Sequence, residues 1–171
     1  MADKSIQPVI ISPATTADVP NVSDLCLLVE RQHEVYSPLR WGLRPDIGER
    51  YPKWLGRIIS DPQWLVLCAR VPGADGAPAQ FAGTLVANLM DEIPIYVCPR
   101  YAFIHEIAVL PEFRRRGIAV ELLKEVRRWA GGQGVWQVRL IAAELNPAAQ
   151  ALFASVGYQV TYQEMIQPTA L

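Results

Sequence analysis

A turn that combines three arginines with a glycine is the feature of this sequence that points most directly to chemistry. Residues 114–117 read Arg-Arg-Arg-Gly, and an apolar helical pattern begins directly after them. The first four amide groups of a helix lack partners inside the helix, and the aligned peptide dipoles place about half a positive charge at that end. A diphosphate group can therefore bind there with little help from side chains. Gly117 permits an unusual backbone angle or a close approach, and the small Ala119 leaves room for an anion.

The simpler interpretation of the same residues is an ordinary helix start beside a solvated basic turn. The three arginines would then only face water, and Gly117 would only shape the turn. Physical chemistry by itself does not separate these two interpretations, so the elements around the turn have to be considered.

Those elements can be outlined from hydrophobic periodicity. Strands are expected at residues 64–70, 80–88, 101–110, 136–142 and 158–166, and helices at residues 19–36, 118–130 and 147–156. Asp18 and Asn146 are placed to cap two of the helices. Gly and Pro in residues 71–78 predict a hairpin between the first two strands, so the sheet is expected to be mixed. The pattern predicts an α/β (α+β) fold in a single domain over residues 1–171.

Composition narrows the class of protein. The chain has 171 residues, 51% apolar and 19% charged, which is long enough to bury a core without disulfides or a metal. A formal charge of -1 disfavours nucleic acid and anionic membranes as partners. Three cysteines without CxxC spacing (Cys26, Cys68 and Cys98) predict free thiols in a reducing compartment and no metal site. Residues 1–11 lack the pattern of a secretion signal, and no apolar run approaches the ~18 residues of a membrane span, so a cytoplasmic protein is expected.

Two segments resemble known motifs. Residues 107–123 (IAVLPEFRRRGIAVELL) resemble motif A of the GCN5-related N-acetyltransferase (GNAT) superfamily, which reads Arg or Gln, two residues, Gly, one residue, then Gly or Ala. The residues that match this pattern are Arg114, Gly117 and Ala119. Residues 146–158 (NPAAQALFASVGY) resemble the motif B that follows it in the family. With the order of elements, the resemblance covers residues 7–166, although the first half matches in layout rather than in residues.

The resemblance implies a fold and a function. The fold is a three-layer α/β/α sandwich with a mixed, mostly antiparallel sheet that is splayed at the coenzyme A site. The function is that of an N-acetyltransferase, which passes the acetyl group of acetyl-CoA directly to a primary amine of a small molecule, peptide or protein. In relatives the splayed strand holds the pantetheine arm and the acetyl carbonyl, and the loop before the next helix holds the pyrophosphate. The matching residues are Ile107, Ala108 and Val109 in the strand and Arg115, Arg116, Gly117, Ile118, Ala119 and Val120 in the loop.

Motif B adds one expected coenzyme contact and one departure from the family. Asn146 matches a position that contacts the coenzyme, and its alternative role is a helix cap alone. Relatives often carry a Tyr seven residues later, where its hydroxyl can protonate the departing thiolate, but this chain has Phe153, which is expected to line the coenzyme site and has no proton to give. Tyr158 is near in sequence and is a candidate proton donor, although relatives use an aromatic residue there mainly for packing. Water is the other source, since a thiol with a pKa of about 8.5 is a tolerable leaving group.

His105 and Glu106 are the candidate bases for the acceptor amine. An alkyl ammonium with a pKa of about 10.4 must lose a proton before it attacks, which costs roughly 4.6 kcal/mol at neutral pH. A charge in an apolar strand is costly without a task, which favours Glu106, although a salt bridge to an arginine explains it almost as well. Neighbouring strand residues point to opposite faces, so at most one of the two should face the cleft unless a bulge intervenes. Some relatives place a base five residues before the Asn of motif B, where this chain has Ile141.

The acceptor is expected to bind under residues 33–54, which correspond in layout to the variable cover of this site in the family. Arg40 or Arg44 would be suited to fix a carboxylate on the acceptor. The aromatic residues of this stretch, Trp41, Tyr51 and Trp54, would either receive the amine or simply pack over the sheet.

Two other hypotheses stay open. Phe153 permits a catalytically inactive coenzyme A-binding or regulatory module, and a structural α/β domain without a ligand is the third. The motifs of zinc hydrolases, phosphate-loop enzymes, dinucleotide-binding enzymes and serine hydrolases are incomplete in the sequence. The oligomeric state does not follow from the sequence, and the dimers common in the family suggest a homodimer only by analogy.

Overall fold

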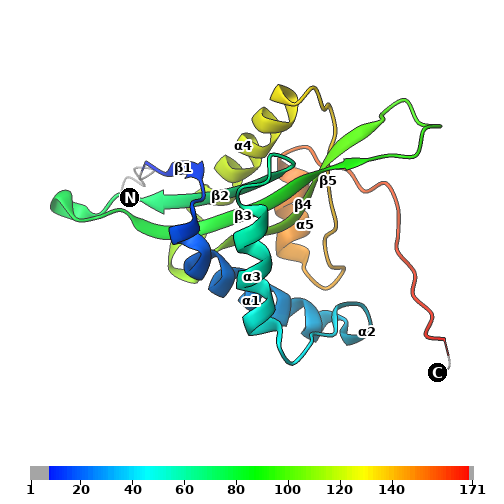
Figure 1. The fold of residues 1–171 in the computed structure, drawn as a ribbon, viewed down its shortest axis with the longest axis horizontal. Coiled ribbons are helices and arrows are strands. Elements are labelled where there is room, and N and C mark those ends of the chain that lie inside the picture. Colours follow the sequence, from blue (N-terminus) through cyan, green and yellow to red (C-terminus); the bar gives the residue numbers. More distant parts are fainter. Residues whose placement is uncertain (1–7, 170–171) are drawn as a thin grey trace.

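The computed structural model describes residues 8–169, which form one five-stranded sheet (Figure 1). The strands lie side by side in chain order as β1 (Ile10–Pro13), β2 (Trp64–Val71), β3 (Gln80–Asp91), β4 (Arg100–Val109) and β5 (Val138–Leu140). The first four pair antiparallel, and β5 pairs parallel with β4. The sheet is therefore mixed and mostly antiparallel, as expected. Gln7, the first residue of the range that the resemblance covers, lies outside the described residues.

Helices cover both faces of this sheet. They are α1 (Val19–Tyr36), α2 (Pro38–Trp41), α3 (Ile47–Ile58), α4 (Ile118–Gly132) and α5 (Pro147–Ser155). Single 3-10 turns lie at Thr16–Asp18, Ala74–Gly76 and Pro111–Phe113. Side chains of α1 and α3 form one apolar core with the sheet, and side chains of α4 and α5 form another. The three-layer α/β/α sandwich is confirmed.

The central strand β3 shows why the strand sequences are apolar along their whole length. Leu85 and Ala87 belong to the core under α4, whereas Val86 between them belongs to the core under α1 and α3. Successive strand residues point to opposite faces, so a strand covered by helices on both sides needs apolar residues at every position. The same alternation decides which residues of β4 face which layer.

The helix expected directly after the basic turn is present as α4. Its buried residues are Ile118, Leu122, Leu123, Val126 and Ala130, which recur at helical spacing. Because this apolar stripe packs on the sheet, the beginning of α4 is fixed close to the end of β4. The turn that connects them is therefore held in place from both sides.

The strand expected at residues 158–166 is absent, and this prediction was wrong. Residues 158–169 have no regular secondary structure, and the chain runs away from the sheet here (Figure 1). The alternating side chains stay in solvent, with Val160 92% and Met165 91% exposed. Alternation specifies a strand only where a neighbouring backbone offers hydrogen bonds, and within residues 8–169 the outermost strand, β5, is only three residues long. The fourth strand of the expected series, residues 136–142, is correspondingly shortened to Val138–Leu140.

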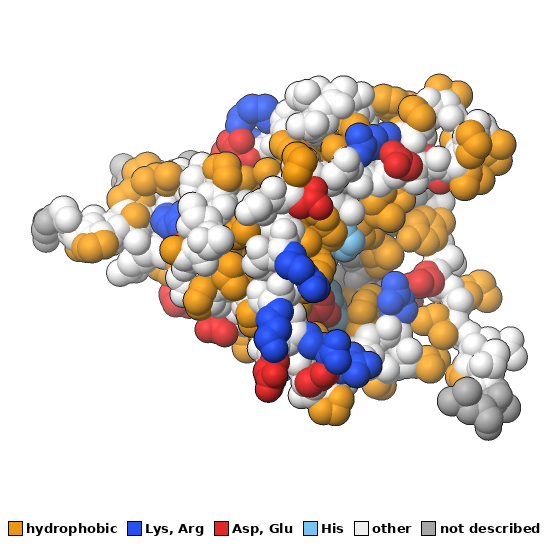
Figure 2. All heavy atoms as spheres, in the orientation of Figure 1, with side chains coloured by type: hydrophobic (Ala, Val, Ile, Leu, Met, Phe, Trp, Pro, Cys, Tyr) orange, Lys and Arg blue, Asp and Glu red, His pale blue; other side chains and the backbone are white. Residues whose placement is uncertain are grey.

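The surface carries charges of both signs. Figure 2 shows basic and acidic side chains next to one another over the region of α2 and α3, while hydrophobic side chains gather at the projecting connection between β3 and β4. The exposed hydrophobic residues of that connection are Ile93, Ile95, Tyr96 and Val97. None of the helices in the described part of the chain combines the length and apolar character that crossing a membrane requires.

Candidate active site

The turn before α4 has the backbone geometry of an anion-binding loop. Arg115 has a φ of 62° and Gly117 a φ of 81°, so left-handed residues flank Arg116. Such alternation turns successive amide groups toward one side. Gly117 is the N-cap of α4, and a Cβ built on it would meet nothing within 4 Å. The glycine is therefore required by its backbone angle, and the space in front of the helix is open.

Two of the three arginines brace this turn. Nε of Arg114 donates to the carbonyl of Val109 at 3.0 Å, which ties the turn to the end of β4. Nη2 of Arg116 donates to the carbonyl of Glu112 at 2.9 Å, and its guanidinium lies 5.3 Å from the centre of the Phe113 ring. These arginines thus shape the turn as well as adding positive charge beside the helix N-terminus.

Next to this turn, β4 separates from β5. The two strands pair only from Ala102 with Val138 to Ile104 with Leu140. Beyond that point, residues 107–109 pair with β3 on one side and with no described strand on the other. The sheet is therefore splayed where the resemblance implied, and one edge of Ile107, Ala108 and Val109 is open.

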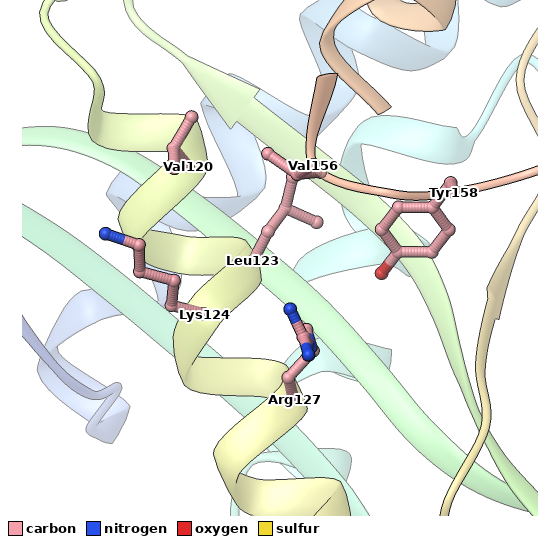
Figure 3. Close-up of a pocket in the computed structure, with 6 residues that line it drawn as sticks. All are labelled: Val120, Leu123, Lys124, Arg127, Val156 and Tyr158. Carbon is pink, nitrogen blue, oxygen red and sulfur yellow. The ribbon is translucent and has the colours of Figure 1, made fainter. Parts of the chain in front are cut away.

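A hollow of about 220 Å³ lies between α4 and the chain that follows α5 (Figure 3). Its lining residues are Val120, Leu123, Lys124, Arg127, Val156 and Tyr158. The Tyr158 hydroxyl points toward α4 and has no hydrogen-bond partner within residues 8–169. Burial raises the pKa of Tyr158 to about 12, so the hydroxyl keeps its proton. Tyr158 lies on the α4 side of the sheet.

The two other motif B residues have clear structural roles. Oδ1 of Asn146 accepts a hydrogen bond from the amide of Ala149 at 3.1 Å, so Asn146 caps α5. Phe153 is buried in the core under α4, and its ring centre lies 5.7 Å from that of Tyr158. The cap is confirmed, while coenzyme contacts of Asn146 and Phe153 stay predictions.

A β-bulge brings both candidate bases to the same side of the sheet. Glu106 lies opposite Val86 and Ile104 lies opposite Ala87, so His105 between them has no partner position on β3. Glu106 therefore faces the α1 layer, as Val86 does. The ring of His105 stacks at 5.1 Å on Trp64, which belongs to the same layer. The bulge is the exception under which both residues can face one cleft.

Glu106 is a buried carboxyl next to a second one. Its side chain is 6% exposed, and within residues 8–169 its Oε2 has no hydrogen-bond partner. The carboxyl of Glu30 on α1 is near enough to act on it. Burial, together with the hydrogen bond and charge of Glu30, raises the pKa of Glu106 well above its usual range. The neutral form of Glu106 is thus favoured more than it is in an exposed carboxyl.

Glu30 is the site residue that the sequence did not reveal. It lies on a helix far from Glu106 in the chain, and no motif marks it. Burial raises its pKa, but the hydrogen bonds from His33 and Glu106 and the charge of His33 outweigh this and lower the pKa to about 2. Nδ1 of His33 lies 3.9 Å from the Glu30 carboxylate. Glu30 is therefore the more acidic of the two carboxyls.

His105 is held in one tautomer. Its Nε2 lies 2.9 Å from Oδ1 of Asn88, and because an amide oxygen only accepts, Nε2 carries the proton. The Nδ1 atom is therefore the basic one. Burial lowers the pKa of His105, while the charge of Glu30 acts against this, so the ring is neutral at pH 7.

Aromatic rings line the α1 side of the site. Ring centres of Trp54 and Trp64 lie 5.3 Å apart, and Phe103 lies 5.0 Å from His105. Trp41 stacks on His33 at 5.1 Å, whereas Tyr51 is buried in the core. Several of these rings meet edge to face, and together they form an apolar wall on the α1 side of the sheet.

The two arginines expected to fix an acceptor carboxylate already hold carboxylates of this chain. Nε of Arg40 donates to Glu164 at 2.8 Å, and Nε of Arg44 donates to Asp46 at 3.2 Å. Among residues 8–169, the buried carboxyl on this side of the sheet that has no cationic partner is Glu106. Such a group favours a cationic acceptor.

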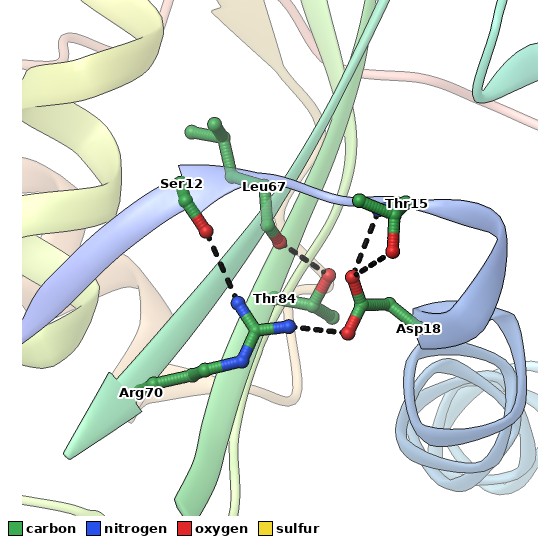
Figure 4. Close-up of polar contacts among 6 residues, drawn as sticks. All are labelled: Ser12, Thr15, Asp18, Leu67, Arg70 and Thr84. Carbon is green, nitrogen blue, oxygen red and sulfur yellow. Dashed lines mark hydrogen bonds and ion pairs between the residues drawn. The ribbon is translucent and has the colours of Figure 1, made fainter. Parts of the chain in front are cut away.

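The start of α1, which carries Glu30, is anchored to β2 (Figure 4). Asp18 was expected to cap this helix, but its side chain makes no cap hydrogen bond. Its Oδ2 accepts from the amide of Thr15 at 2.8 Å, and its Oδ1 pairs with Arg70 of β2. Arg70 also donates to Ser12 at 3.1 Å. A long-range ion pair has replaced the local cap.

The described cysteines and acidic residues do not form a metal centre. Cys26, Cys68 and Cys98 are buried free thiols. Within residues 8–169, no group of three or more His, Cys, Asp or Glu side chains is arranged to hold a metal ion.

A family of known proteins matches most of this chain in sequence. The model of the acetyltransferase (GNAT) family matches residues 35–158, which is most of the chain and includes both motifs. The chain belongs to the GNAT family. The splayed strands and the glycine turn of α4 are thus features of a GNAT domain.

Two relatives are similar in sequence. The chain is 31% identical over 130 residues to an aminoglycoside N(6')-acetyltransferase type 1 of Acinetobacter genomosp. 13, covering 72% of this chain and 82% of the relative. It is 28% identical over 99 residues to an aminoglycoside N(6')-acetyltransferase type 1 of Salmonella typhimurium, covering 56% of this chain. That match spans 64% of the Salmonella relative's length.

A solved structure shares the fold. A predicted acetyltransferase from Clostridium acetobutylicum, crystallised with acetyl-CoA, superposes with a TM-score of 0.70 at 18% identity. The match covers 94% of this chain and 96% of that one. At this identity the similarity establishes the GNAT fold.

Proposed function

We propose that this GNAT protein is an N-acetyltransferase that transfers the acetyl group of acetyl-CoA directly to an aliphatic primary amine. The supporting observation is that one short stretch of chain carries both halves of the chemistry. It contains a buried carboxyl at Glu106, an open strand edge at residues 107–109, and a helix N-terminus at Gly117. Strand β4 thus fixes the position of a proton acceptor, Glu106, relative to that of an anion site at Gly117.

The coenzyme would lie along the open edge of β4. The backbone amides of residues 115–120 would bind its diphosphate. The space in front of Gly117 is open, which leaves room for a bulky anion. The hollow between α4 and Tyr158 would take part of the elongated molecule. When bound, acetyl-CoA supplies an activated acyl carbon. Amides of residues 107–109 would orient its carbonyl and stabilise the negative charge that develops there.

Glu106 would receive a proton from the acceptor nitrogen. Its ionised form must be produced first, and the positive charge of an arriving ammonium favours that ionisation. Nδ1 of His105 is the alternative base, because the ring is neutral and lies on the same side of the sheet. The aromatic wall around Trp64 would exclude water from this region.

The coenzyme thiolate would take its proton from water. Phe153 has none to give, and a phenol with a pKa of about 12 is a poor acid toward a thiolate of pKa about 8.5, because the proton transfer would be uphill. Tyr158 would therefore serve as a packing residue and hydrogen-bond donor. This assignment follows from the burial of its hydroxyl.

For the acceptor, aminosugar amines of the aminoglycoside class are the first to assay, because the similar Acinetobacter and Salmonella proteins bear that name. Amines of other small molecules and of peptides or proteins belong to the same chemical class. A suitable panel contains kanamycin, spermidine and a lysine-containing peptide. Release of free thiol from acetyl-CoA would be recorded with each amine.

Glu106→Gln and His105→Gln identify the base. Loss of turnover in Glu106→Gln, with turnover kept in His105→Gln, supports Glu106, and the reverse pattern supports His105. Absence of thiol release above background hydrolysis with every amine would count against the enzyme.

An inactive coenzyme A-binding module is the second candidate, favoured by the burial of Phe153 where relatives often have a proton donor. Thermal stabilisation by acetyl-CoA without thiol release would support it. No stabilisation at saturating acetyl-CoA would remove both candidates.

A further inference from the structure

His105 is held at the bulge of β4 by contacts on three sides. One face of its ring stacks on Trp64, with the ring centres 5.1 Å apart and an angle of 26° between the planes. Phe103 meets the ring at 5.0 Å with an angle of 70° between the planes. On the third side, Nε2 lies 2.9 Å from Oδ1 of Asn88. The ring is therefore fixed in orientation, although the side chain as a whole is exposed.

The strand register explains why Asn88 reaches this ring. Asn88 of β3 lies opposite Trp64 of β2 and opposite Phe103 of β4. Residues directly opposite each other on neighbouring strands point to the same face of a sheet, so these three side chains share the α1 face. The bulge places His105 on that face as well. Three strands thus build one rigid setting for a single imidazole.

Asn88 is a polar residue in an otherwise apolar stretch of β3. Within residues 81–90 the other polar side chain is Thr84, whose hydroxyl donates to the carbonyl of Leu67 at 2.8 Å. The side-chain amide of Asn88, by contrast, bonds to no backbone group in the described part of the chain, and its partner there is the ring of His105. Asn88 therefore has no described structural contact that explains it apart from His105.

The contact with Asn88 leaves one ring nitrogen available. An amide oxygen accepts and does not donate, so Nε2 carries the proton and Nδ1 keeps a lone pair. Within residues 8–169, Nδ1 makes no hydrogen bond. A neutral imidazole is thus presented with its accepting nitrogen open to a ligand.

We propose that Asn88 is a positioning residue that fixes His105 with its proton on Nε2, so that Nδ1 accepts a hydrogen bond from the acceptor amine. This role rests on the proposed acetyl transfer. Asn88 acts through His105 and does not itself touch the reacting atoms. The contact at Nδ1 orients the acceptor nitrogen whether its proton passes to Glu106 or to His105.

The place of His105 on β4 supports this contact. It precedes the open strand edge at residues 107–109 by two residues, which is roughly 7 Å along an extended strand. An amine held by Nδ1 would thus lie close to the edge where the acetyl carbonyl is proposed to bind. The indole rings of Trp54 and Trp64, 5.3 Å apart, add faces that attract a cation. An ammonium group is therefore the donor that fits best.

The contact depends on the charge of the ring. Below the pKa of His105 both ring nitrogens carry protons, so Nδ1 can no longer accept and the ring repels an ammonium. Burial lowers the pKa of His105 against the charge of Glu30, so the contact is available at neutral pH. The titratable groups on this side of the sheet come from three elements, and they are Glu30 and His33 of α1, Tyr51 of α3 and Glu106 of β4.

Nitrogen-15 NMR tests the tautomer directly. The chain has two histidines, so the ring signals of His105 are identified by their absence in His105→Gln. At about pH 8, where an ordinary imidazole is neutral, we expect the proton on Nε2 and a bare Nδ1. A proton found mainly on Nδ1 would overturn the proposal.

Asn88→Leu and Asn88→Asp form a matched pair of variants. Both side chains are close to Asn in size, but Asp keeps an oxygen that accepts from Nε2 and Leu does not. In Asn88→Leu the share of the tautomer with its proton on Nδ1 should rise about fivefold, the factor that corresponds to one ordinary hydrogen bond. In Asn88→Asp this share should stay as in the unmutated protein. An unchanged share in Asn88→Leu, with thermal unfolding showing a folded protein, would overturn the role of Asn88.

Kinetics test the link to the acceptor. With an amine that is turned over, at about pH 8.5, Asn88→Leu should lower kcat/KM for the amine about 5- to 20-fold and leave the KM for acetyl-CoA within about twofold. Asn88→Asp should recover most of this loss. In Asn88→Asp the acid limb of kcat/KM should also move up by about one pH unit, because a carboxylate beside Nε2 favours the protonated ring. Equal losses in both variants with an unmoved acid limb would indicate a structural role and overturn the proposal.

Two outcomes separate this role from the proposed function. If no amine releases thiol above background hydrolysis, the proposed function fails, whereas the NMR spectra still decide whether Asn88 fixes the ring of His105. If Asn88→Leu turns over the amine as fast as the unmutated protein, the proposed function stands and the positioning role of Asn88 fails.

Discussion

Comparing Gly117→Asp with Gly117→Asn separates two contributions to the affinity for acetyl-CoA, namely the electrostatic attraction of its diphosphate and the shape of the turn. Gly117 has a φ of 81°, and Asn and Asp tolerate this region better than other residues with a side chain. A Cβ at this position meets no atom within 4 Å, so either side chain fits the protein itself. The two variants are nearly equal in size and differ by one negative charge at the N-terminus of α4.

The expected effect follows from Coulomb's law. At roughly 6 Å and an effective dielectric constant of about 40, each diphosphate charge adds about 1.4 kcal/mol of repulsion from Asp. Two such charges, partly screened by salt, weaken binding about 10- to 100-fold relative to Asn. The same carboxylate interacts favourably with the helix dipole by about 0.3–1 kcal/mol, so the Asp variant should unfold no more easily than the Asn variant.

Isothermal titration with acetyl-CoA measures the affinities, and thermal unfolding without ligand provides the control. The gap between Gly117→Asp and Gly117→Asn should narrow to about twofold in 1 M salt, where the Debye length is about 3 Å. Equal affinities of the two variants at 0.1 M salt would refute electrostatic capture at this helix start.

Two further changes test the anchoring of α1 and the buried hydroxyl. Burial raises the pKa of Asp18, but hydrogen bonds from Thr15 and the pairing with Arg70 lower it more, so the net pKa lies below the usual range. Asp18 therefore stabilises the fold above its unfolded pKa of about 4 and loses this effect as pH falls through the folded pKa. Asp18→Asn should cost about 1–3 kcal/mol in urea unfolding at pH 7 and much less at pH 3, and a pH-independent cost would contradict the ion pair. Tyr158→Phe removes a hydroxyl without a described partner, so we expect an unchanged or higher Tm and a kcat within about threefold, while a larger loss of kcat would identify Tyr158 as a proton donor.

Short-range interactions explain why the region from the start of α4 to the cap of α5 could be predicted from the sequence. The apolar stripe of α4, the glycine at its start and the Asn146 cap each depend on residues close together in the chain. Helical spacing, capping and left-handed glycine turns are short-range effects, so the sequence predicts them well. The alternation of apolar and polar residues in residues 158–166 is also a local pattern. A strand, however, forms only where a neighbouring strand offers hydrogen bonds, and within the described residues this segment has no such neighbour.

The amino-acid sequence by itself determined the order of the three helices α1, α4 and α5 and of most strands, the glycine turn before α4, and the presence of Phe153 where relatives often carry a Tyr. Only the tertiary structure decided what surrounds Glu106. The bulge at His105 turned two adjacent residues to one layer, and the packing of α1 on β4 brought the charge of Glu30 near Glu106 from a distant part of the chain. Burial and a neighbouring charge set the protonation of a carboxyl, and both depend on residues that the fold, rather than the chain, makes adjacent.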